Sequence, residues 1–408
     1  MWVPLFTACA GALSIQAEMV RRKSILVEET PNALREITLA RGRRLNAVDA
    51  PMLEALFESL RHPAVLLSSL DSRAFCAGGD VRALTSEVVD FLWREAQTLA
   101  RLEEREVSIA ISSGVTMGFG AGLFVASRER VVTEGTVFAM PECRIGLCPD
   151  AGSLSFLRRL PRPIGLWVAL TGARLTASDC LGLGLATRFV RRNSDDYAAL
   201  REELRYAPLD ELEVVLSRRC GVPPRDLASP LCSSEAVLAA LERVAEAEDA
   251  AGVLANVEVE RHRASTLVGS VSWQTRERAE AVFEVLDAGR DAMRASCPLA
   301  LETTFAALST LDANDPGRAR LAEIVINANL ATRPHFAHRV ASLLGGGGGE
   351  NSAISPPPPP LEEDDVKPRA LALVARAQRA LDALDSGMTT TDIKRTYLTS
   401  SSSSSSSS

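Results

Sequence analysis

The chain has 408 residues, of which 46% are hydrophobic and 24% charged, so it is long enough to bury one large core or two ordinary ones. Its formal net charge of −7 is mild and gives no global indication of a nucleic-acid partner. Eight cysteines without a CxxC spacing, together with only four histidines, argue against a disulfide framework and a zinc site and favour a reducing compartment. No apolar run reaches the roughly 18 residues that span a membrane.

The composition of the first 23 residues is more typical of a targeting segment than of a part of the folded core. An apolar, Ala-rich segment is followed by Arg21, Arg22 and Lys23, which is the reverse of the order in a secretory signal. We therefore expect an atypical mitochondrial presequence and a mitochondrial protein. An ordinary N-terminal arm is the alternative.

The next part of the chain alternates between strand and helix signals. Runs at 24–29 and 33–40 flank a Pro-Asn turn and predict a hairpin, and a helix is expected at 50–60 with Asp49 as its N-cap. Further strands are expected at 64–70, 107–111, 129–134, 136–140 and 186–190, and a loop at 73–82 follows the first of them. Further helices are expected at 85–104, from the turn at 114–122 through 127, and at 153–160, 163–170 and 177–183. This alternation predicts an α/β architecture with a largely parallel sheet.

The second half of the chain is predicted to be helical and then to become low in complexity. Strand signals are lacking at 197–345, where Ala, Leu, Glu and Arg predominate. A glycine tract, a polyproline tract and a terminal serine run follow, with one more helix expected at about 369–386. The predicted parts are an N-terminal arm (1–23), an α/β core (24–195), a helical region (196–344), a linker (345–366), a terminal helix (367–398) and a disordered tail (399–408).

Two glycine-rich turns carry the first chemical signal. Ala77-Gly78-Gly79-Asp80 leaves a buried strand, and Gly118-Phe119-Gly120 leaves the next one and opens a helix. Two such turns side by side can aim two backbone N–H groups at one oxygen, which is the geometry of an oxyanion hole. Each turn alone is better explained by tight backbone geometry, but the pair with nearby acids favours a site.

Glu142 and Asp150 supply the second signal. Both lie beside prolines in apolar sequence, within the stretch 113–152. A carboxyl group in apolar surroundings has a raised pKa and becomes a better base near neutral pH. A single buried acid is usually a helix cap or an ion-pair partner, whereas this spaced pair beside the glycine turns favours catalysis.

Four segments resemble the crotonase (enoyl-CoA hydratase/isomerase) superfamily and, within it, the 3-hydroxyisobutyryl-CoA hydrolase family. They are AFCAGGDVR, GVTMGFGAGL, VFAMPECRIGLCPDAG and ALTGARLTASDCLGLGLATRFV. The resemblance covers about residues 24–190 well. It implies an α/β, crotonase-like (ClpP/crotonase) spiral core of ββα units with a C-terminal helical region. It also implies hydrolysis of 3-hydroxyisobutyryl-CoA to 3-hydroxyisobutyrate and CoA in valine catabolism, with no cofactor besides the CoA of the substrate.

The resemblance also implies residue roles. The N–H groups of Gly79 and Phe119 would bind the thioester oxygen. Glu142 would attack the thioester or activate water, and Asp150 would hold the substrate hydroxyl or assist hydrolysis. The expected partner is an acyl-CoA substrate. The resemblance leaves open whether the chain forms a homo-oligomer, and we expect no metal, no membrane and no direct nucleic-acid contact. The substrate-binding positions would be Ala77, Gly78, Asp80, Gly118 and Gly120.

Several positions depart from the family pattern. Phe119 stands where relatives usually have glycine, so its side chain must find room and a glycine-only dihedral would be strained. Ala96 occupies the place of a substrate-side glutamate in the WREAQ segment. The family's C-terminal motifs survive only as INANLA at 326–331 and FAHRVA at 336–341, where His338 replaces an acid.

These departures leave a second class of function open. The chain could keep the fold and serve as a structural component of the mitochondrial small ribosomal subunit. Glu142 and Asp150 favour the enzyme, whereas the departures and the low-complexity tracts favour the scaffold. Hydratase or isomerase activity is a further alternative, which is disfavoured because hydratases usually carry a glutamate where Ala121 or Gly122 stands.

Overall fold

The computed structural model describes residues 24–82, 88–224, 227–269, 272–312, 315–345 and 362–398. The backbone divides into two compact units, each assembled from separate stretches of chain. The first contains the chain up to Asp80, Gln97–Ala139 and Arg174–Ser229, and the second contains Val81–Ala96, Met140–Ala173 and the chain from Pro230. The expected presequence, most of the predicted linker and the serine tail lie outside the described residues.

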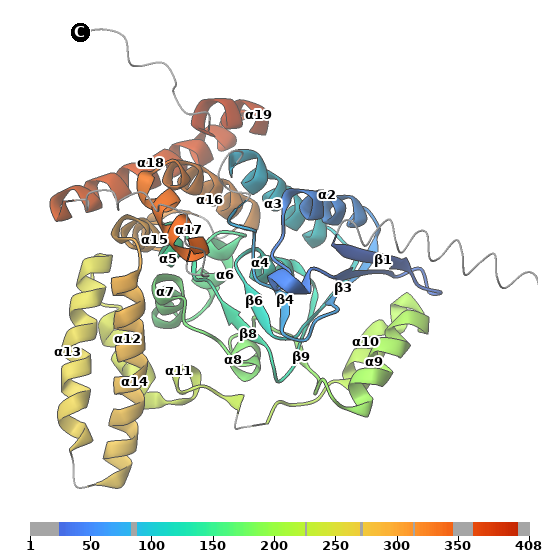
Figure 1. Cartoon of the computed structure of the whole chain (residues 1–408), viewed down its shortest axis with the longest axis horizontal. Helices are drawn as coiled ribbons and strands as arrows, with labels where there is room; N and C mark the ends of the chain where they lie inside the picture. Colours follow the sequence, from blue (N-terminus) through green and yellow to red (C-terminus); the bar gives the residue numbers. More distant parts are fainter. Residues whose placement is uncertain are drawn as a thin grey trace, which may run out of the picture. The chain divides into compact units, whose positions relative to one another are not determined.

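The first unit is an α/β body with two sheets (Figure 1). Six strands form the larger sheet in the order β1-β2-β3-β5-β7-β9, and three form the smaller one in the order β4-β6-β8. β1 and β2 pair antiparallel as the expected hairpin, and every later pairing of these strands is parallel, as predicted. The strands are β1 (Ile25–Glu29), β2 (Arg35–Leu39), β3 (Ala64–Ser69), β4 (Ala74–Cys76), β5 (Val107–Ser112), β6 (Val115–Met117), β7 (Glu129–Val132), β8 (Val137–Ala139) and β9 (Arg188–Phe189).

The helices of the first unit begin at recognisable caps. In α2 (Ala50–Ser59) the Asp49 side chain accepts a hydrogen bond from the backbone N–H of Met52, and proline occupies the first turn, so the predicted N-cap is confirmed. In α8 (Ala177–Gly182) the side chains of Thr176 and Asp179 form a reciprocal capping box. The other helical segments are η1 (Gly42–Arg44), α4 (Phe119–Ala126), α9 (Asp195–Tyr206), η3 (Leu209–Glu211) and α10 (Leu212–Arg219).

Two strands of the smaller sheet correct the sequence prediction. β4 lies inside the segment 73–82 that we predicted to be a loop, and β6 lies inside the predicted turn at 114–122. Each strand is only three residues long, so neither is long enough to show the alternation that identifies a strand in a sequence. Their pairing partners lie some 40 residues apart in the chain, which a local pattern does not reveal.

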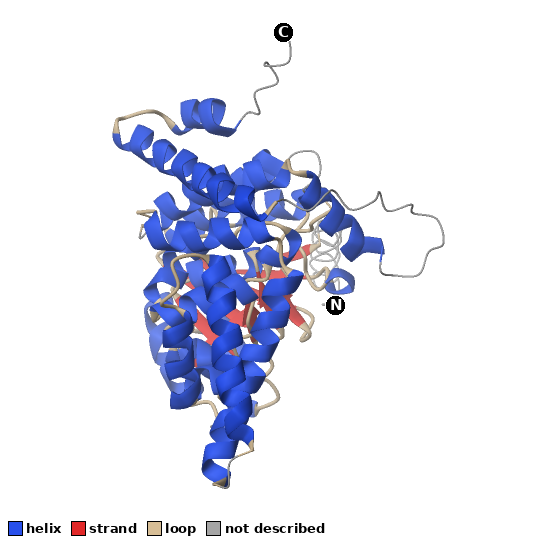
Figure 2. Ribbon diagram, turned by 90° about the vertical axis from the view of Figure 1, so that its left-hand side faces the viewer, coloured by secondary structure: helices blue, strands red, loops and turns tan. Residues whose placement is uncertain are grey.

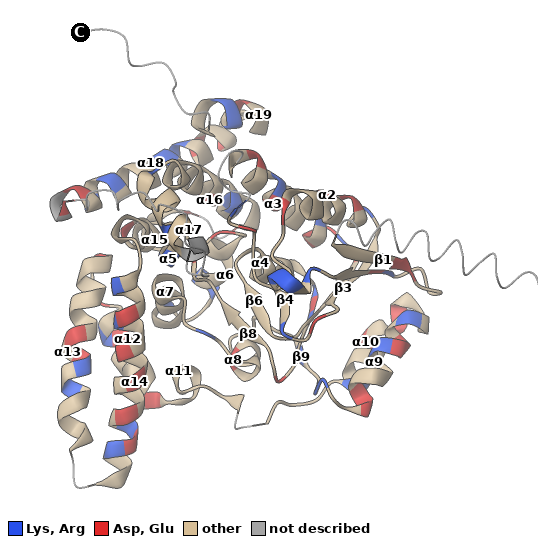
Figure 3. Ribbon diagram, in the orientation of Figure 1, with Lys and Arg blue, Asp and Glu red and all other residues tan. Residues whose placement is uncertain are grey.

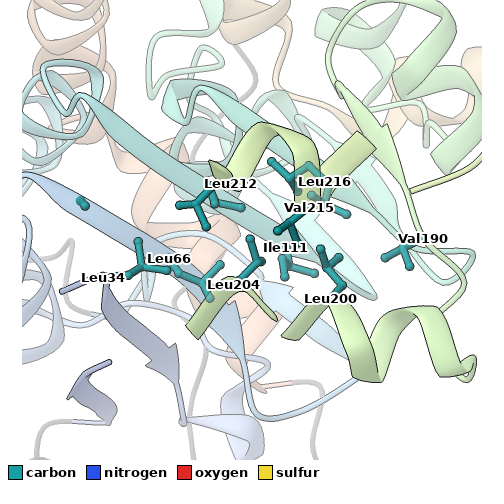
Figure 4. Close-up of a cluster of buried hydrophobic side chains, with 12 residues drawn as sticks. Leu34, Leu66, Ile111, Val190, Leu200, Leu204, Leu212, Val215 and Leu216 are labelled. Carbon is teal, nitrogen blue, oxygen red and sulfur yellow. The ribbon is translucent and has the colours of Figure 1, made fainter. Parts of the chain in front are cut away.

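A hydrophobic core fixes α9 and α10 against the larger sheet (Figure 4). Side chains from β3, β5 and β7 meet side chains from the two helices, and full burial of such a side chain contributes about 1.5–3 kcal/mol. The buried members of this core are Leu34, Ala64, Leu66, Ile109, Ile111, Val131, Val190, Leu200, Leu204, Leu212, Val215 and Leu216.

The described residues of the second unit form helices and no strands. Helices also follow one another throughout 197–345, as predicted, and Figure 2 shows that helices outnumber strands in the molecule. α13 and α14 pack against each other along their length, and α18 packs against α15 and α16. The helices are α5 (Glu142–Ile145), α6 (Ser153–Arg159), α7 (Arg162–Thr171), α11 (Pro230–Ser233), α12 (Glu235–Val244), α13 (Ala250–Val268), α14 (Trp273–Ala295), α15 (Pro298–Thr310), α16 (Pro316–Ala331), α17 (Pro334–Gly345), α18 (Glu363–Asp385), α19 (Thr390–Ile393) and the final turn η5 (Lys394–Leu398). The helix α3 (Val88–Glu103) is divided between the units: its residues up to Ala96 belong to the second unit and those from Gln97 to the first.

The terminal helix starts earlier than expected. α18 begins at Glu363, so residues 363–366 of the predicted linker are its first turn. Pro368 lies inside this helix. Because a proline usually marks a helix boundary, the sequence pattern indicated a start after Pro368 instead of before it. The other predicted domain boundaries stay predictions.

Charges in the second unit are interspersed rather than segregated (Figure 3). Along α13 and α14, for example, Arg261 lies 3.4 Å from Asp287 and 3.2 Å from Glu258. Ion pairs near the surface contribute about 0–1 kcal/mol each, so these partly exposed pairs add little to the stability of the unit. Across the described residues, no helix combines the length and the apolar composition that a membrane crossing needs.

Candidate active site

The two predicted glycine turns lie against each other within the first unit. They follow β4 and β6, which are neighbours in the smaller sheet. Gly78 has a φ of 105° and Gly118 a φ of 53°, left-handed values that favour glycine. A Cβ placed on Gly78 would lie 3.7 Å from the backbone nitrogen of Phe119, so the two turns lie side by side with room for no more than a methyl group between them at this point. The side-by-side arrangement that an oxyanion hole requires is therefore present.

The N–H groups of Gly79 and Phe119 have no acceptor among the residues that the structure describes. Phe119 is the first residue of α4, where helix geometry leaves the N–H unpaired and at the positive end of the helix dipole. Gly79 pairs with Val48 only through the flanking peptide groups: Val48 donates to the oxygen of Gly78 at 2.8 Å, and Asp80 donates to the oxygen of Val48 at 2.7 Å. Both N–H groups can therefore serve a bound oxygen.

Phe119 does not carry the backbone strain that its replacement of glycine suggested. Its φ is not positive, and the unusual backbone conformation falls on the preceding residue, Gly118, with φ 53° and ψ −126°. The phenyl ring is packed in the interior, with 2% of the residue exposed. The expectation of a strained dihedral at this position is wrong, because the turn places its glycine-only conformation one residue earlier.

The remaining predicted positions support the turns. The carboxylate of Asp80 lies 2.9 Å from the guanidinium of Arg41. At Gly120, a Cβ would lie only 2.3 Å from the backbone oxygen of Cys76. The first turn of α4 therefore packs directly on the end of β4, and this contact leaves no room for a side chain at Gly120. The N–H of Ala77 donates to the oxygen of Leu45 at 3.0 Å. Their predicted contacts with a substrate stay predictions.

The second unit holds Glu142 and Asp150 in a group of four carboxyls, of which the three glutamates are buried and Asp150 is partly buried. Glu142 opens α5, and Asp150 lies in the loop between α5 and α6. Glu95 reaches the group from α3 and Glu323 from α16, and each of the three glutamates is at most 7% exposed. Asp150, Glu95 and Glu323 also line one small cavity of about 10 Å³, roughly the space of a single water molecule. We call these four residues the carboxyl cluster.

Burial raises the pKa of every member of the carboxyl cluster. The pKa values of Glu95 and Glu142 lie well above the ordinary value, first because of burial and then because of the negative charge of Asp150. Burial also raises the pKa of Asp150 to about 6, against the opposing effect of a hydrogen bond from Asn327. The pKa of Glu323 rises to about 8, because burial outweighs two hydrogen bonds from backbone N–H groups. At neutral pH the cluster therefore carries more protons than four free carboxyls would.

One oxygen of Glu142 is left without a partner. Its Oε2 is buried and accepts no hydrogen bond from the described residues. A buried polar atom without a partner costs about 1–3 kcal/mol, and such atoms in native proteins call for an explanation such as a catalytic role. Within the described part of the chain, no group of three or more His, Cys, Asp or Glu residues could hold a metal ion.

Sequence reasoning found two members of the carboxyl cluster and missed Glu95 and Glu323. Both signals were present. Glu95 lies on the buried stripe of α3, in register with Leu92 and Leu99, and Glu323 interrupts the apolar run of α16. An acid on the apolar stripe of a helix has the same meaning as an acid in an apolar loop. We applied that criterion only to the stretch around Glu142.

The parallel strand order of the first unit and the helical second unit define a crotonase-type fold, and solved structures share it. An enoyl-CoA hydratase from Rhodobacter sphaeroides 2.4.1 superimposes with a TM-score of 0.64, covering 86% of this chain and 97% of that one at 24% identity. A carnitinyl-CoA dehydratase from Mycobacterium thermoresistibile gives a TM-score of 0.64, covering 84% and 99% at 23% identity. At these identities the likeness shows the fold alone, and it confirms the predicted fold class.

Residues 34–345 match the family model of enoyl-CoA hydratase/isomerase, and the chain belongs to that family. It is 35% identical to 3-hydroxyisobutyryl-CoA hydrolase 1 of Arabidopsis thaliana over 272 residues, which cover 57% of this chain and 68% of the relative. It is 39% identical to the mitochondrial 3-hydroxyisobutyryl-CoA hydrolase of Xenopus tropicalis over 183 residues, 41% of this chain and 47% of the relative. The rat protein of that name is 36% identical over 45% of this chain and 55% of its own length. The predicted resemblance is confirmed, although the alignments span about half the length of most of these relatives.

Proposed function

We propose that the protein is a CoA-thioester hydrolase that converts 3-hydroxyisobutyryl-CoA and water to 3-hydroxyisobutyrate and CoA. The observation that carries the proposal is Glu142, a buried carboxyl with an unpaired oxygen inside the carboxyl cluster. The chain that carries Glu142 belongs to the enoyl-CoA hydratase/isomerase family, and several of its curated relatives are named 3-hydroxyisobutyryl-CoA hydrolase. Several vertebrate relatives are named as mitochondrial, which supports a mitochondrial location for this protein as well.

The N–H groups of Gly79 and Phe119 supply the first part of the reaction. They donate hydrogen bonds to the thioester carbonyl oxygen, on which negative charge develops as the carbonyl carbon is attacked. Each donor of this kind typically lowers the barrier by about 2.7–4 kcal/mol. Both donors are backbone groups fixed by the turns, so they need little reorganisation when the charge appears.

Glu142 supplies the second part. In its ionised form it attacks the thioester carbonyl carbon, or it takes a proton from the water that attacks there. The C–S bond then breaks, and CoA leaves as a thiolate that takes up a proton. Where water attacks, its oxygen ends in the product carboxylate; where Glu142 itself attacks, the acyl–Glu142 anhydride that forms is hydrolysed by water, which releases the product and restores the Glu142 carboxylate. The raised pKa of Glu142 makes its ionised form a stronger base. Asp150 accepts a hydrogen bond from the 3-hydroxyl group of the acyl chain.

Hydrolysis fits this chain better than hydration does. Hydratases usually carry a second glutamate at the position of Ala121 or Gly122. Both residues are buried in α4 and have no carboxylate to offer. The expected backbone strain at Phe119 was one reason to consider a scaffold role in a ribosomal subunit. Phe119 is the first residue of α4 and has no positive φ, so this reason no longer applies.

Release of CoA thiol from 3-hydroxyisobutyryl-CoA by the purified protein tests the proposal. We expect turnover by the wild type and a loss of about 10²–10⁴-fold in kcat for Glu142→Gln. Glu58→Gln, in a salt bridge with Arg61 on the surface, is the matched control and should keep full activity. Absence of turnover in the folded wild type, with cosedimentation with small ribosomal subunits, would refute the hydrolase and support the scaffold. Hydration of an enoyl-CoA without thiol release would support the hydratase.

A further inference from the structure

A cavity of about 340 Å³ lies on the face of the larger sheet that α9 covers. Its walls come from β1, β2, the end of β3, α9 and the segment before α9, all of which belong to the first unit. The volume falls within the range of small-molecule sites, about 300–1,000 Å³. The cavity shares no residue with the glycine turns or with the carboxyl cluster, so it is a separate feature of the fold.

The pattern of α9 explains why a polar cavity forms here. The apolar side of the helix packs on the larger sheet through the core described above (Figure 4). Tyr197, Arg201 and Arg205 lie four residues apart, so they share another face of the helix, and all three line the cavity. Opposite them, alternation along β2 places Glu36 on the same side as Leu34 of the core. The apolar core therefore ends at these residues, and charged side chains line the space beyond it.

Two of the three arginines in the cavity are paired with carboxylates. Glu36 is 3% exposed, and its two oxygens accept hydrogen bonds from Arg201 and Arg205. Arg205 also donates to Glu28 of β1. A buried carboxylate needs such partners, because an unpaired buried charge lowers stability strongly. These pairs fasten α9 to the sheet, and that structural role explains them.

The third arginine, Arg192, has no such explanation, because no carboxylate of the described residues forms an ion pair with it. One of its N–H groups donates to the neutral hydroxyl of Tyr197 at 2.9 Å, and its guanidinium carbon lies 5.2 Å from the centre of that ring. Asp71 lies within electrostatic range, but Arg73 already donates to both of its oxygens. Three guanidinium groups and two carboxylates therefore leave the lining of the cavity with one unbalanced positive charge.

We propose that this cavity binds a small organic carboxylate, whose oxygens accept hydrogen bonds from Arg192 and Arg201. The planar fork of an arginine matches the two oxygens of a carboxylate, and Arg201 gives only one of its N–H groups to Glu36. One negative charge neutralises the unbalanced lining, whereas a doubly charged anion would reverse its sign.

The rest of the lining suits the body of such a molecule. Leu26, Leu70 and the ring of Tyr197 provide apolar wall beside the arginines. Arg192 is also held in place before any ligand binds, since its backbone N–H donates to the side chain of Glu134 at 2.8 Å and its guanidinium is bonded to Tyr197. A donor that is already ordered loses little conformational freedom on binding, which favours affinity.

Nitrogen-15 NMR of the arginine side chains measures the binding of isobutyrate, a carboxylate on a short apolar body. Increasing isobutyrate should move the Nε–Hε signal of Arg192, assigned from Arg192→Gln, to a saturating value. Isobutyramide has the same shape without the charge and should leave the signal in place. In Arg192→Gln, the affinity read from the Arg201 signal should fall by at least about tenfold, as expected for one lost hydrogen bond between charged groups. Arg191→Gln removes the neighbouring exposed arginine, which does not line the cavity, and should bind isobutyrate as the wild type does.

The proposal is overturned if the Arg192 signal does not saturate with isobutyrate, if isobutyramide shifts it equally, or if folded Arg192→Gln binds isobutyrate as tightly as the wild type. Tighter binding of inorganic phosphate than of isobutyrate would also overturn it, because the cavity would then select another class of anion. If Arg192→Gln fails to fold, the comparison of isobutyrate with isobutyramide in the wild type still decides. Arg192→Lys, which keeps the charge without the fork, should then weaken binding by less than the loss of the charge. None of these measurements uses thiol release, so they are independent of the proposed function.

Discussion

Gly120→Ala is the sharpest perturbation that the first unit offers. Gly120 lies in the first turn of α4, and its missing side chain lets the helix meet the backbone of Cys76. An added Cβ would lie 2.3 Å from the oxygen, 2.6 Å from the Cβ and 2.8 Å from the carbonyl carbon of Cys76. Real Cβ contacts are essentially never below 3.0 Å, and two of these three atoms are backbone, which no rotamer change can move. The strand or the helix must therefore shift by at least about 0.7 Å.

This shift would act on both expected oxyanion donors. Cys76 precedes the turn that carries Gly79, and Gly120 follows Phe119 directly. Overpacking of this size typically costs about 1–3 kcal/mol of stability. Complete loss of one donor typically lowers kcat by about 10²–10³-fold, which sets the upper limit for a displaced donor. We expect both effects in Gly120→Ala, measured by urea unfolding and by thiol release from 3-hydroxyisobutyryl-CoA at saturating substrate.

Gly182→Ala provides the control for introducing a methyl group. Gly182 lies in α8 of the same unit, and a Cβ there would meet no atom within 4 Å. Alanine in a helix is favoured over glycine by up to about 1 kcal/mol, so this variant should be as stable as the wild type or slightly more stable, with full activity. Wild-type kcat in a correctly folded Gly120→Ala protein would refute the assignment of these two turns to the oxyanion hole.

Two further predictions concern stability. Glu95→Gln should become more stable relative to the wild type as the pH rises from about 4.5: the pKa of the folded glutamate is raised by burial, so its contribution is complete below the unfolded value of 4.5 and is lost above it. The difference in melting temperature between Glu95→Gln and the wild type, measured at pH values between about 4 and 8, should grow with pH. A difference that stays constant would contradict an origin in the protonation of Glu95. Asp49→Ala should lower the free energy of unfolding by about 1 kcal/mol in urea, because the N–H of Met52 loses its acceptor; Asp49→Asn, which still accepts, should restore most of it.

Local patterns in the sequence predict those features that depend on neighbouring residues. The hairpin of β1 and β2, the cap at Asp49 and the exceptional placement of Glu142 all depend on residues within about ten positions of one another. The pairing of β4 with β6 and the gathering of Glu95 and Glu323 around Asp150 depend on segments that lie far apart in the chain. Short-range patterns can mark Glu95 and Glu323 as acids on apolar helix faces, but the strand pairing and the gathering around Asp150 become visible only in the fold.

The dihedral angle at Phe119 illustrates a different limit. A glycine preference in a family identifies a tight turn, but it does not say which of two adjacent residues takes the left-handed conformation. Here Gly118 takes it, so the residue after it can be any residue whose side chain fits the interior. The substitution alone therefore carried less information about activity than the backbone around it.

The glycine turns of the first unit and the carboxyl cluster of the second differ in how much each says about function. Tight turns are explained by packing alone, since Gly120 must be small to meet Cys76 whether or not an oxygen ever binds nearby. The carboxyl cluster has no such explanation, because apolar side chains of similar volume in place of buried ionisable groups are often neutral or stabilising. Four acids whose charged forms are disfavoured by burial, one of them with an unpaired oxygen, lower the stability of the fold that contains them. The carboxyl cluster is thus the stronger evidence for chemistry.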